Sequence, residues 1–285
     1  MLAQRLSAIY VRLRQSLPAP LVIALRRLSP LLHVARRLDP KKPTVLPLIG
    51  PLAGHRMRVG PPYHWAMAYG HYEPAVCRVL EQTVRAGWTA VDVGAHIGYM
   101  SLLLAKCVGP GGKVLAFEPL PENVALLLEN VALNGYHNIR VESMAVAQGS
   151  GTARLYDGPT TSQATLHTAG EGASRMVGAC SLDDYFRLQG FPQVDFVKVD
   201  VEGAEGLVVT GAREVLARSQ PIWVIELHGE AARPAVTALA QAGYRLLLVT
   251  ESAAPTPWAP SNPIGHSHCL ALPAVQSAQL NAESS

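Results

Sequence analysis

The sequence is poor in charge and in cysteine and has no long apolar segment, and each shortage excludes a class of protein. Only 16% of its 285 residues are charged and 49% are hydrophobic, which excludes disorder throughout the chain. The longest apolar stretch near the start, residues 17–25, is far shorter than the ~20 residues of a membrane-spanning helix, and it lacks the form of a secretory signal. The four cysteines form no CxxC pair, which predicts neither a zinc site nor a disulfide framework and favours a reducing, cytoplasmic compartment.

Positive charge is concentrated at the start of the chain. Residues 1–42 hold nine Lys or Arg and one acid, Asp39, so their net charge is +8, and a total of +3 leaves −5 for the rest. A nucleic-acid enzyme would carry positive charge around its cleft, so we expect no nucleic-acid partner. Leucine stripes interrupted by prolines predict a basic amphipathic helical arm. The arm either packs on its own domain or a second subunit, or lies peripherally on the inner face of a membrane, and an organellar transit peptide is a third alternative.

The remaining chain divides into a linker, an α/β domain and a tail. Residues 43–73 are rich in Pro and Gly and predict a linker with short strands, residues 74–272 the main domain, and residues 273–285 a disordered tail. Strands are expected at Ala90–Val93, Lys113–Glu118, Ile139–Met144, Asp195–Asp200, Ile222–Leu227, Tyr244–Val249 and His268–Leu272. Helices are expected at roughly Pro74–Ala86, Tyr99–Val108, Pro121–Asn134, Ala204–Ala217 and Glu230–Ala242.

This alternation of strands and helices predicts an α/β fold with a doubly wound, mostly parallel sheet and helices on both faces. Continuous apolar runs such as FVKVDV are typical of strands that are covered on both sides. Residues 145–190 break the alternation. There, GSGTARLY predicts a hairpin, and the Gly/Ser/Thr-rich stretch after it predicts a loop over the edge of the sheet.

The segment VDVGAHIGYMSLLLA, residues 91–105, carries the first chemical signal. A strand that includes Asp92 leads through Gly94 and Gly98 into a helix, with the spacing D-x-G-x-x-x-G. A dinucleotide fingerprint would read GxGxxG and would hold a pyrophosphate at the helix N-terminus. An acid before the first glycine repels a diphosphate but suits a ligand with an ammonium group, such as S-adenosylmethionine. An ordinary tight turn would have the same short pattern.

A second signal is Glu118, which ends the apolar stretch KVLAFE 24 residues after Gly94. In doubly wound folds an acid at the end of the second strand holds a ribose diol. NAD and S-adenosylmethionine both carry that diol, so only the glycine spacing favours the latter. The segment GPGGKV lacks the Ser or Thr of a phosphate-binding loop.

Acidic residues and one histidine follow two later strands. Asp200 and Glu202 lie where one strand ends. Glu226 and His228 lie two residues apart at the end of the next strand, so they are on one side of an extended segment. Ligands of open α/β sheets bind at this edge, and converging acids are tolerated where they bind a cation or transfer protons. His228 is a candidate general base near neutral pH, or else a surface histidine.

In this order, VDVGAHIGYMSLLLA, AFEPLPENVALLLENVALNG, SLDDY, VDFVKVDVEGAEGLVVTGA and PIWVIELHG resemble the FkbM family of class I S-adenosylmethionine-dependent methyltransferases. The resemblance spans roughly residues 70–250, and KVDVEGAE is its most specific part. It implies a seven-stranded sheet with the last strand antiparallel. It also implies O-methylation of a hydroxyl of a sugar, glycan, glycolipid or other natural product.

By position, the resemblance implies two sets of site residues. Those expected around the cofactor are Glu73, Asp92, Gly94, Ala95, His96, Gly98, Glu118, Pro119 and Ala145. Those expected at the reaction site are Asp200, Glu202, Glu226 and His228. His96 departs from the family, which more often has Asn there.

Two other functions stay open from the residues alone. One is a nucleotide-dependent oxidoreductase, which the glycine spacing disfavours, and the other is a non-catalytic ligand-binding module. No metal site is assigned, although Asp200, Glu202 and Glu226 could hold Mg²⁺ or Mn²⁺. The histidines of GHSH, residues 265–268, have no companion ligands in the sequence and are expected to be structural.

Overall fold

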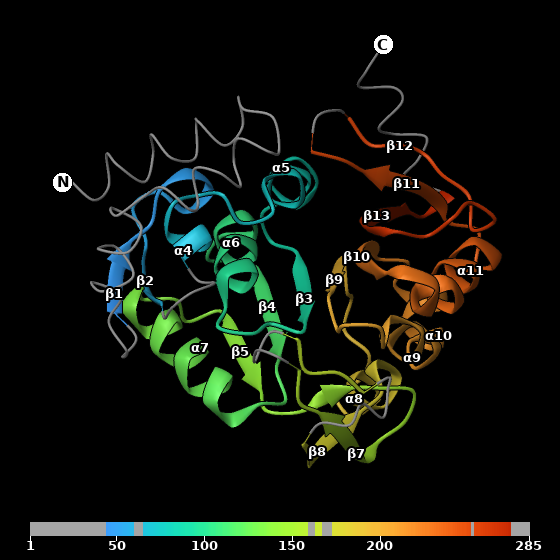
Figure 1. Cartoon of the computed structure of the whole chain (residues 1–285), viewed down its shortest axis with the longest axis horizontal. Coiled ribbons are helices and arrows are strands. Elements are labelled where there is room, and N and C mark those ends of the chain that lie inside the picture. The colour runs from blue at the N-terminus through green and yellow to red at the C-terminus, as the bar shows by residue number, and fades with distance from the viewer. Residues whose placement is uncertain (1–43, 60–64, 159–162, 167–172, 252–253, 275–285) are drawn as a thin grey trace, which may run out of the picture.

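A computed structural model describes residues 44–59, 65–158, 163–166, 173–251 and 254–274 (Figure 1). The predicted helical arm at residues 1–42 lies outside these ranges, as does the tail from residue 275, so both stay predictions. Within the described ranges no helix is long and apolar enough to cross a membrane.

A central sheet of eight strands organises the molecule. Its order is β12-β11-β13-β10-β9-β3-β4-β5. The last strand, β13, runs antiparallel to its neighbours β10 and β11, and the edge strand β12 runs antiparallel to β11. Seven of these strands match the expectation, and the two-residue β12 adds an eighth at the edge. The strands are β3 (Thr89–Val93), β4 (Lys113–Phe117), β5 (Ile139–Glu142), β9 (Phe196–Val199), β10 (Ile222–His228), β11 (Arg245–Val249), β12 (Thr256–Pro257) and β13 (His266–Leu272).

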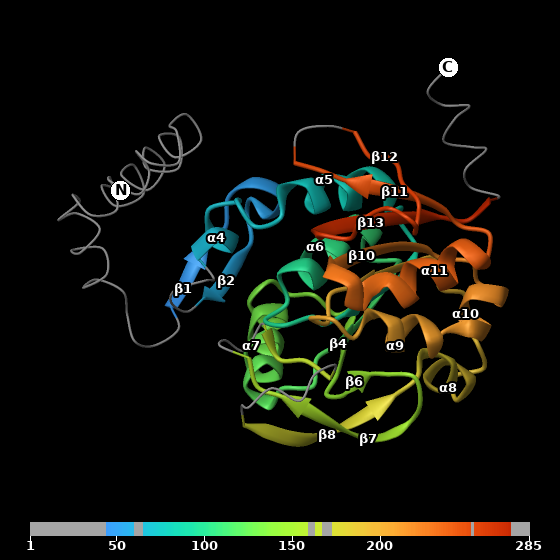
Figure 2. The ribbon, with the colours of Figure 1, turned by 45° about the vertical axis from the view of Figure 1, so that its right-hand side comes forward.

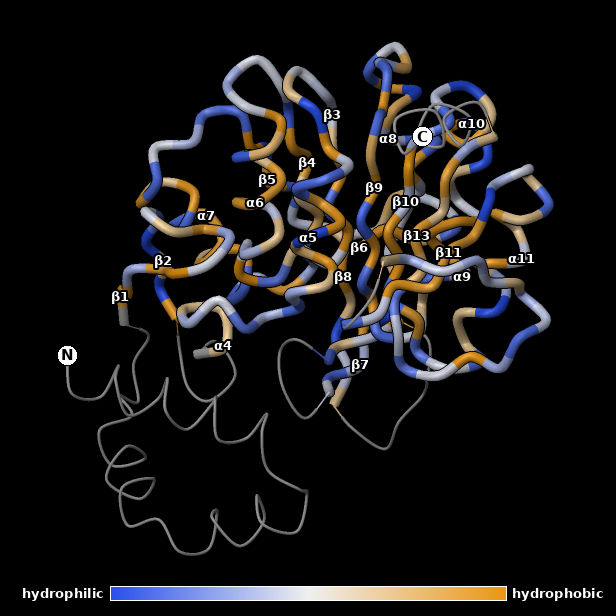
Figure 3. The backbone as a smooth tube through the Cα atoms, turned by 90° about the horizontal axis from the view of Figure 1, so that it is seen from above, coloured by the Kyte–Doolittle hydropathy of each residue, from blue (hydrophilic) through white to orange (hydrophobic). Residues whose placement is uncertain are grey.

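Helices cover both faces of the sheet (Figure 2). Helices α5 (Pro74–Thr83), α6 (Tyr99–Val108) and α7 (Pro121–Leu133) pack on one face. On the other face lie α8 (Leu182–Arg187), α9 (Glu205–Thr210), α10 (Arg213–Arg218) and α11 (Arg233–Gln241), the last preceded by a 3-10 turn at Gly229–Ala232. The hydropathy colouring of Figure 3 shows apolar residues along the strands. The fold is therefore the predicted doubly wound α/β architecture.

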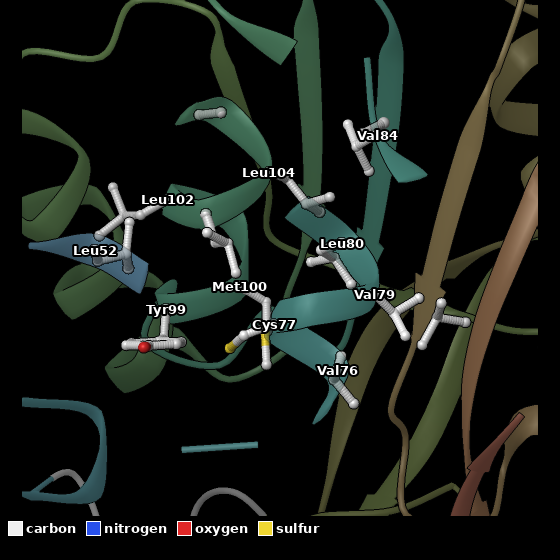
Figure 4. Packing of buried hydrophobic residues seen from close by; sticks show 14 of the residues in the cluster. Leu52, Val76, Cys77, Val79, Leu80, Val84, Tyr99, Met100, Leu102 and Leu104 are labelled. Carbon is white, nitrogen blue, oxygen red and sulfur yellow. The ribbon is translucent and has the colours of Figure 1, made fainter. Parts of the chain in front are cut away.

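Successive side chains of a strand point to opposite faces of the sheet, so each central strand contributes to both layers. Within β9, Phe196 packs on the α5–α6 side while its neighbours Val197 and Val199 pack on the α9–α11 side. Figure 4 shows the first layer, in which Cys77 and Leu80 of α5 face Met100 and Leu104 of α6. Both sides of each central strand are thus buried, which explains their continuous apolar runs.

The helix expected at 204–217 is two helices, because the chain bends at Gly211. A Cβ atom there would lie 2.3 Å from the carbonyl oxygen of Ala147, so only glycine permits this close approach. The bend separates α9 from α10 and lets Asp183 accept hydrogen bonds from the backbone N–H groups of Glu214 and Val215.

GSGTARLY forms one strand of the expected hairpin, and its partner lies beyond the loop. The strand β7 (Gly151–Tyr156) pairs antiparallel with β8 (Ser174–Cys180), the next strand along the chain, and β6 (Ala145–Val146) runs parallel to β8. The helix α8 was missed, although Ser181 caps it by accepting a hydrogen bond from the backbone N–H of Asp184 at 3.0 Å.

The linker contains the short strands expected of it. The strands β1 (Thr44–Pro47) and β2 (Arg56–Val59) form an antiparallel pair, followed by the single-turn α4 (Trp65–Ala68). Two asparagines hold this pair. Asn130 of α7 and Asn134, the residue that caps the C-terminus of α7, bond the backbone N–H and C=O groups of Arg58 and Arg56, respectively. Asn130 also donates to the carbonyl of Ile97 at 2.8 Å, so it ties the linker to the glycine loop after β3.

Candidate active site

A cavity of about 340 Å³ opens at the edge of the sheet where β3, β4, β9 and β10 end. This volume is in the range of small-molecule sites. Nine of the predicted site residues line it: Glu73, Gly94, His96, Glu118, Pro119, Ala145, Asp200, Glu202 and Glu226. Apolar side chains complete the wall, among them Met67, Val93, Phe117, Met144, Leu155 and Leu166. The other four predicted residues, Asp92, Ala95, Gly98 and His228, are not in the lining.

The glycine loop after β3 is shaped by close backbone contacts. Gly94 has φ +81°, and a Cβ atom there would lie 1.8 Å from the carbonyl oxygen of Asp200. Gly98 has φ +95° and caps α6, and a Cβ there would meet Leu127 at 2.3 Å. Gly94 therefore lets this loop lie against the segment after β9, and Gly98 lets it lie against α7. The first contact brings the glycine loop and the acidic residues to one cavity.

Glu118 is buried at the end of β4, and the surrounding donors fix its carboxylate. Its Oε1 accepts hydrogen bonds from the backbone N–H of Leu120 at 3.0 Å and from Asn123 at 3.1 Å. Its Oε2 accepts one from the backbone N–H of His96 at 2.9 Å. Burial raises the pKa of Glu118 to about 7, against the effect of these donors. The carboxylate is therefore positioned in advance at the cavity wall.

Asp92 lies behind the cavity wall. It is fully buried, accepts a hydrogen bond from the Ser101 hydroxyl at 2.6 Å, and lies 4.0 Å from the Lys198 ammonium. Lys198 is itself buried and lies 3.2 Å from Asp200. The acid of the D-x-G-x-x-x-G motif thus neutralises a buried lysine, a role the sequence reasoning did not foresee.

The pKa values of Asp200 and Glu226 are shifted in opposite directions. Burial opposes ionisation of Asp200, but the Lys198 charge outweighs it, so the pKa of Asp200 is lowered. Burial and the nearby Asp200 charge raise the pKa of Glu226 well above its ordinary value. At neutral pH, Asp200 is therefore the anion of the pair and Glu226 holds the proton.

His228 lies between two acidic residues rather than facing the cavity. Its Nδ1 is 2.8 Å from Oε1 of Glu205, and its Nε2 is 3.2 Å from Oε2 of Glu202. Burial lowers its pKa, but the bonds to these carboxylates prevail and raise the pKa to about 10. At neutral pH His228 therefore favours its protonated form, which cannot accept a proton, and its role as a general base stays a prediction.

Two histidines that sequence reasoning set aside belong to this site. The β10–β13 register places His266 opposite His228 and His268 opposite Glu226. Nε2 of His266 lies 2.9 Å from Oε1 of Glu226, and Nε2 of His268 lies 3.4 Å from Oε2 of Glu73. The expectation that they lack companions is wrong. The antiparallel pairing that supplies those companions is not visible in the local sequence.

Comparison with known proteins places the fold and site in a family. The model of the methyltransferase FkbM domain matches residues 92–246, which is more than half of the chain. The chain belongs to the FkbM methyltransferase family. The match extends from the glycine loop to β11 and includes Glu118, Asp200, Glu226 and His228.

Curated relatives share parts of this FkbM chain. A protein-L-isoaspartate O-methyltransferase of Aeropyrum pernix is 37% identical over 103 residues, which cover 32% of this chain and 39% of the relative. Methyltransferase sdnD of Sordaria araneosa is 31% identical over 156 residues, covering 44% and 60%. The chain thus spans less than two thirds of the length of these relatives.

Among solved structures, methyltransferase FkbM from Methylobacillus flagellatus has 18% sequence identity and a TM-score of 0.43, covering 68% of this chain and 50% of that one. Aeropyrum pernix fibrillarin, solved with natively bound S-adenosylmethionine, has 15% identity and a TM-score of 0.43, covering 70% and 74%.

Proposed function

We propose that this FkbM protein is an S-adenosylmethionine-dependent O-methyltransferase acting on a hydroxyl of a sugar, glycan, glycolipid or other natural product. The observation that carries the proposal is a cavity that two different sets of residues line. One wall holds the glycine loop and the fixed carboxylate of Glu118, and the other holds Asp200, Glu202 and Glu226.

The residues of the first wall fit the cofactor. Glu118 is held by three N–H donors and still presents carboxylate lone pairs to the cavity, which suits a ribose diol. Gly94 brings its backbone to the cavity wall without a side chain, and Glu73 adds a carboxylate to the lining. When bound, S-adenosylmethionine supplies a sulfonium methyl group to the acceptor oxygen, and the electrons of the broken C–S bond stay on sulfur.

The residues of the second wall fit an acceptor that must lose a proton. Asp200 lines the cavity and is anionic, so it can accept the hydrogen bond and then the proton of a hydroxyl. Glu226, which holds its proton, can donate a hydrogen bond to the same acceptor. The apolar part of the wall excludes water and orients the acceptor, and positioning contributes most because the methyl donor is already activated.

The proposal is tested by transfer from methyl-labelled S-adenosylmethionine to a panel of hydroxylated glycans, glycolipids and other natural products. An isoaspartyl peptide serves as a comparison acceptor, because the Aeropyrum pernix relative is named a protein-L-isoaspartate O-methyltransferase. We expect label in a hydroxyl-bearing acceptor, and a large loss of rate in Asp200→Asn. Glu251→Gln, at an exposed residue outside the cavity lining, is the matched control and should keep the rate.

Label found only in the peptide would overturn the hydroxyl assignment. Tight binding of NADH with no binding of S-adenosylmethionine would favour the oxidoreductase alternative instead.

A further inference from the structure

Three metal-binding side chains converge beside the cavity from two paired strands. Glu226 and His228 come from β10, and His266 comes from β13, directly opposite His228. Oε1 of Glu226 lies 2.9 Å from Nε2 of His266 and 3.9 Å from Nε2 of His228, and all three ligand atoms lie within 4.8 Å of one another. Ligands of a tetrahedral ion at about 2.1 Å are roughly 3.4 Å apart, so this spacing needs only small side-chain shifts.

His228 is oriented as metal-binding histidines are. Its Nδ1 lies 2.8 Å from Oε1 of Glu205, a fully buried carboxylate that also accepts a hydrogen bond from the backbone N–H of Gly203. A carboxylate on one ring nitrogen fixes the ring and directs the other nitrogen to an ion. Nε2 of His228 is buried and makes no hydrogen bond of normal geometry, although Glu202 is nearby.

The carboxylates around these three side chains also favour the binding of a cation. Five carboxylates meet around this point: Glu73, Asp200, Glu202, Glu205 and Glu226. Among the ion pairs of the described residues there, Lys198 is the one permanent cation, and its ammonium lies between Asp92 and Asp200 rather than beside Glu226. Like charges this close are costly unless protons or a positive ion compensate them, and a bound ion would displace the protons that Glu226 and His228 hold.

We propose that Glu226, His228 and His266 bind one divalent transition-metal ion at the mouth of the cavity. Two imidazoles and one carboxylate are a ligand set that suits Zn²⁺ and Fe²⁺, and three protein ligands leave a coordination position open. Because Glu226 and His266 both line the cavity, an ion held by them would lie beside the proposed acceptor. Use of the ion to hold an acceptor oxygen rests on the proposed function, whereas binding of the ion does not.

The test uses the full, untagged chain, stripped with a chelator and titrated with Zn²⁺ by calorimetry. Metal content after dialysis is measured by mass spectrometry. We expect one Zn²⁺ per chain. His266→Ala should weaken binding by more than ~100-fold, the upper end of what loss of a supporting residue costs. The His266 side chain is 70% exposed, so this change should leave the thermal midpoint of the stripped protein unaltered.

His137→Ala is the matched control, since His137 is exposed in the segment between α7 and β5 and should bind no ion. No saturable Zn²⁺ binding, or equal affinity in wild type and His266→Ala, would overturn the proposal. Loss of binding in His268→Ala with retention in His266→Ala would overturn it too, because the ion would then belong to Glu73, Glu226 and His268. Each result is obtained without methyl transfer, so it is independent of whether an acceptor is found.

Discussion

Residues around the cavity hold their backbone in the left-handed region. Among them are the glycines 94 and 98 and three residues that carry a side chain, Glu73, His96 and Glu202, with φ between 42° and 53°. A side chain in this region costs of order 1–3 kcal/mol and persists where surrounding contacts enforce it. All three residues with a strained backbone and a side chain line the cavity, which supports its identification as the functional site.

Gly94→Ala separates backbone strain from steric conflict. Gly87 has a similar φ of +85° but nothing within 4 Å of a Cβ atom, so Gly87→Ala is a matched control. We expect the control to cost about 1–2 kcal/mol of unfolding free energy. Gly94→Ala should cost about 1–3 kcal/mol more, because the Asp200 carbonyl must move, and it should weaken cofactor binding. Urea denaturation measures both, and equal losses would contradict the close approach.

Glu118 predicts how cofactor affinity changes with pH. Its folded pKa is about 7, so the carboxylate becomes charged as the pH rises through 7, and a charged acceptor holds a diol more strongly. Affinity for S-adenosylmethionine should therefore fall below pH 7, by up to ~10-fold per unit. Glu118→Ala should remove this dependence and cost about 2–4 kcal/mol of binding. Calorimetry between pH 6 and 8 checks this, and a variant with the wild-type profile would refute the assignment.

At the scale of elements, the β1–β2 pair is attached to α7 by side chains that substitute for a neighbouring strand. Asn130 and Asn134 are four residues apart and lie on one face of α7, so each offers both an acceptor and a donor to the edge of β2. The linker therefore packs as part of the domain even though its strands are short.

Asn130→Ala should destabilise the protein by about 2–3 kcal/mol, because it removes the buried hydrogen bond to the carbonyl of Ile97 and the part-buried one from the backbone N–H of Arg58. Asn134→Ala removes more exposed bonds and should cost about 1 kcal/mol. The midpoints of chemical unfolding give both values. If both variants lose the same free energy of unfolding, the hydrogen bonds of Asn130 contribute no more to stability than the more exposed ones of Asn134.

Elements that depend on neighbouring residues could be predicted from the sequence. Contacts between segments that lie far apart in the sequence could not. Continuous apolar runs located β3, β4, β9 and β10, and the glycine spacing and Glu118 indicated a part of the chain that lines the cavity. The partner of β7 lies beyond a loop, and the companions of His266 and His268 lie on another strand. Asp92 was read as facing the ligand, because its partner Lys198 is 106 positions away in the sequence.

At the scale of the whole molecule, charge separates a basic start from a mildly acidic domain. Residues 1–42 carry +8 and the remainder −5. Near an anionic membrane each basic residue contributes about 1 kcal/mol of attraction, which the acidic remainder does not share. The same arm could instead pack on the domain or on a second subunit through its leucines.

Removal of residues 1–42 distinguishes these roles. Since prolines 18, 20 and 30 divide the leucine stripes into short pieces, we favour packing and expect the truncated chain to aggregate or change its oligomeric state. Light scattering measures this change. A truncated chain that stays monodisperse and active, but no longer co-sediments with anionic vesicles as the full chain does, would establish the membrane role instead.

The antiparallel last strand has a consequence for how the protein is made. Glu73 and His268 are 195 positions apart in the sequence, yet they lie 3.4 Å apart beside the cavity. At about 5–20 residues per second, a ribosome needs roughly 10–40 seconds to synthesise the intervening chain. Asp200 and Glu226 are made within that interval, and the acidic edge that they form lacks His266 and His268 until the interval ends. A nascent chain can therefore form the parallel strands before it can complete the site.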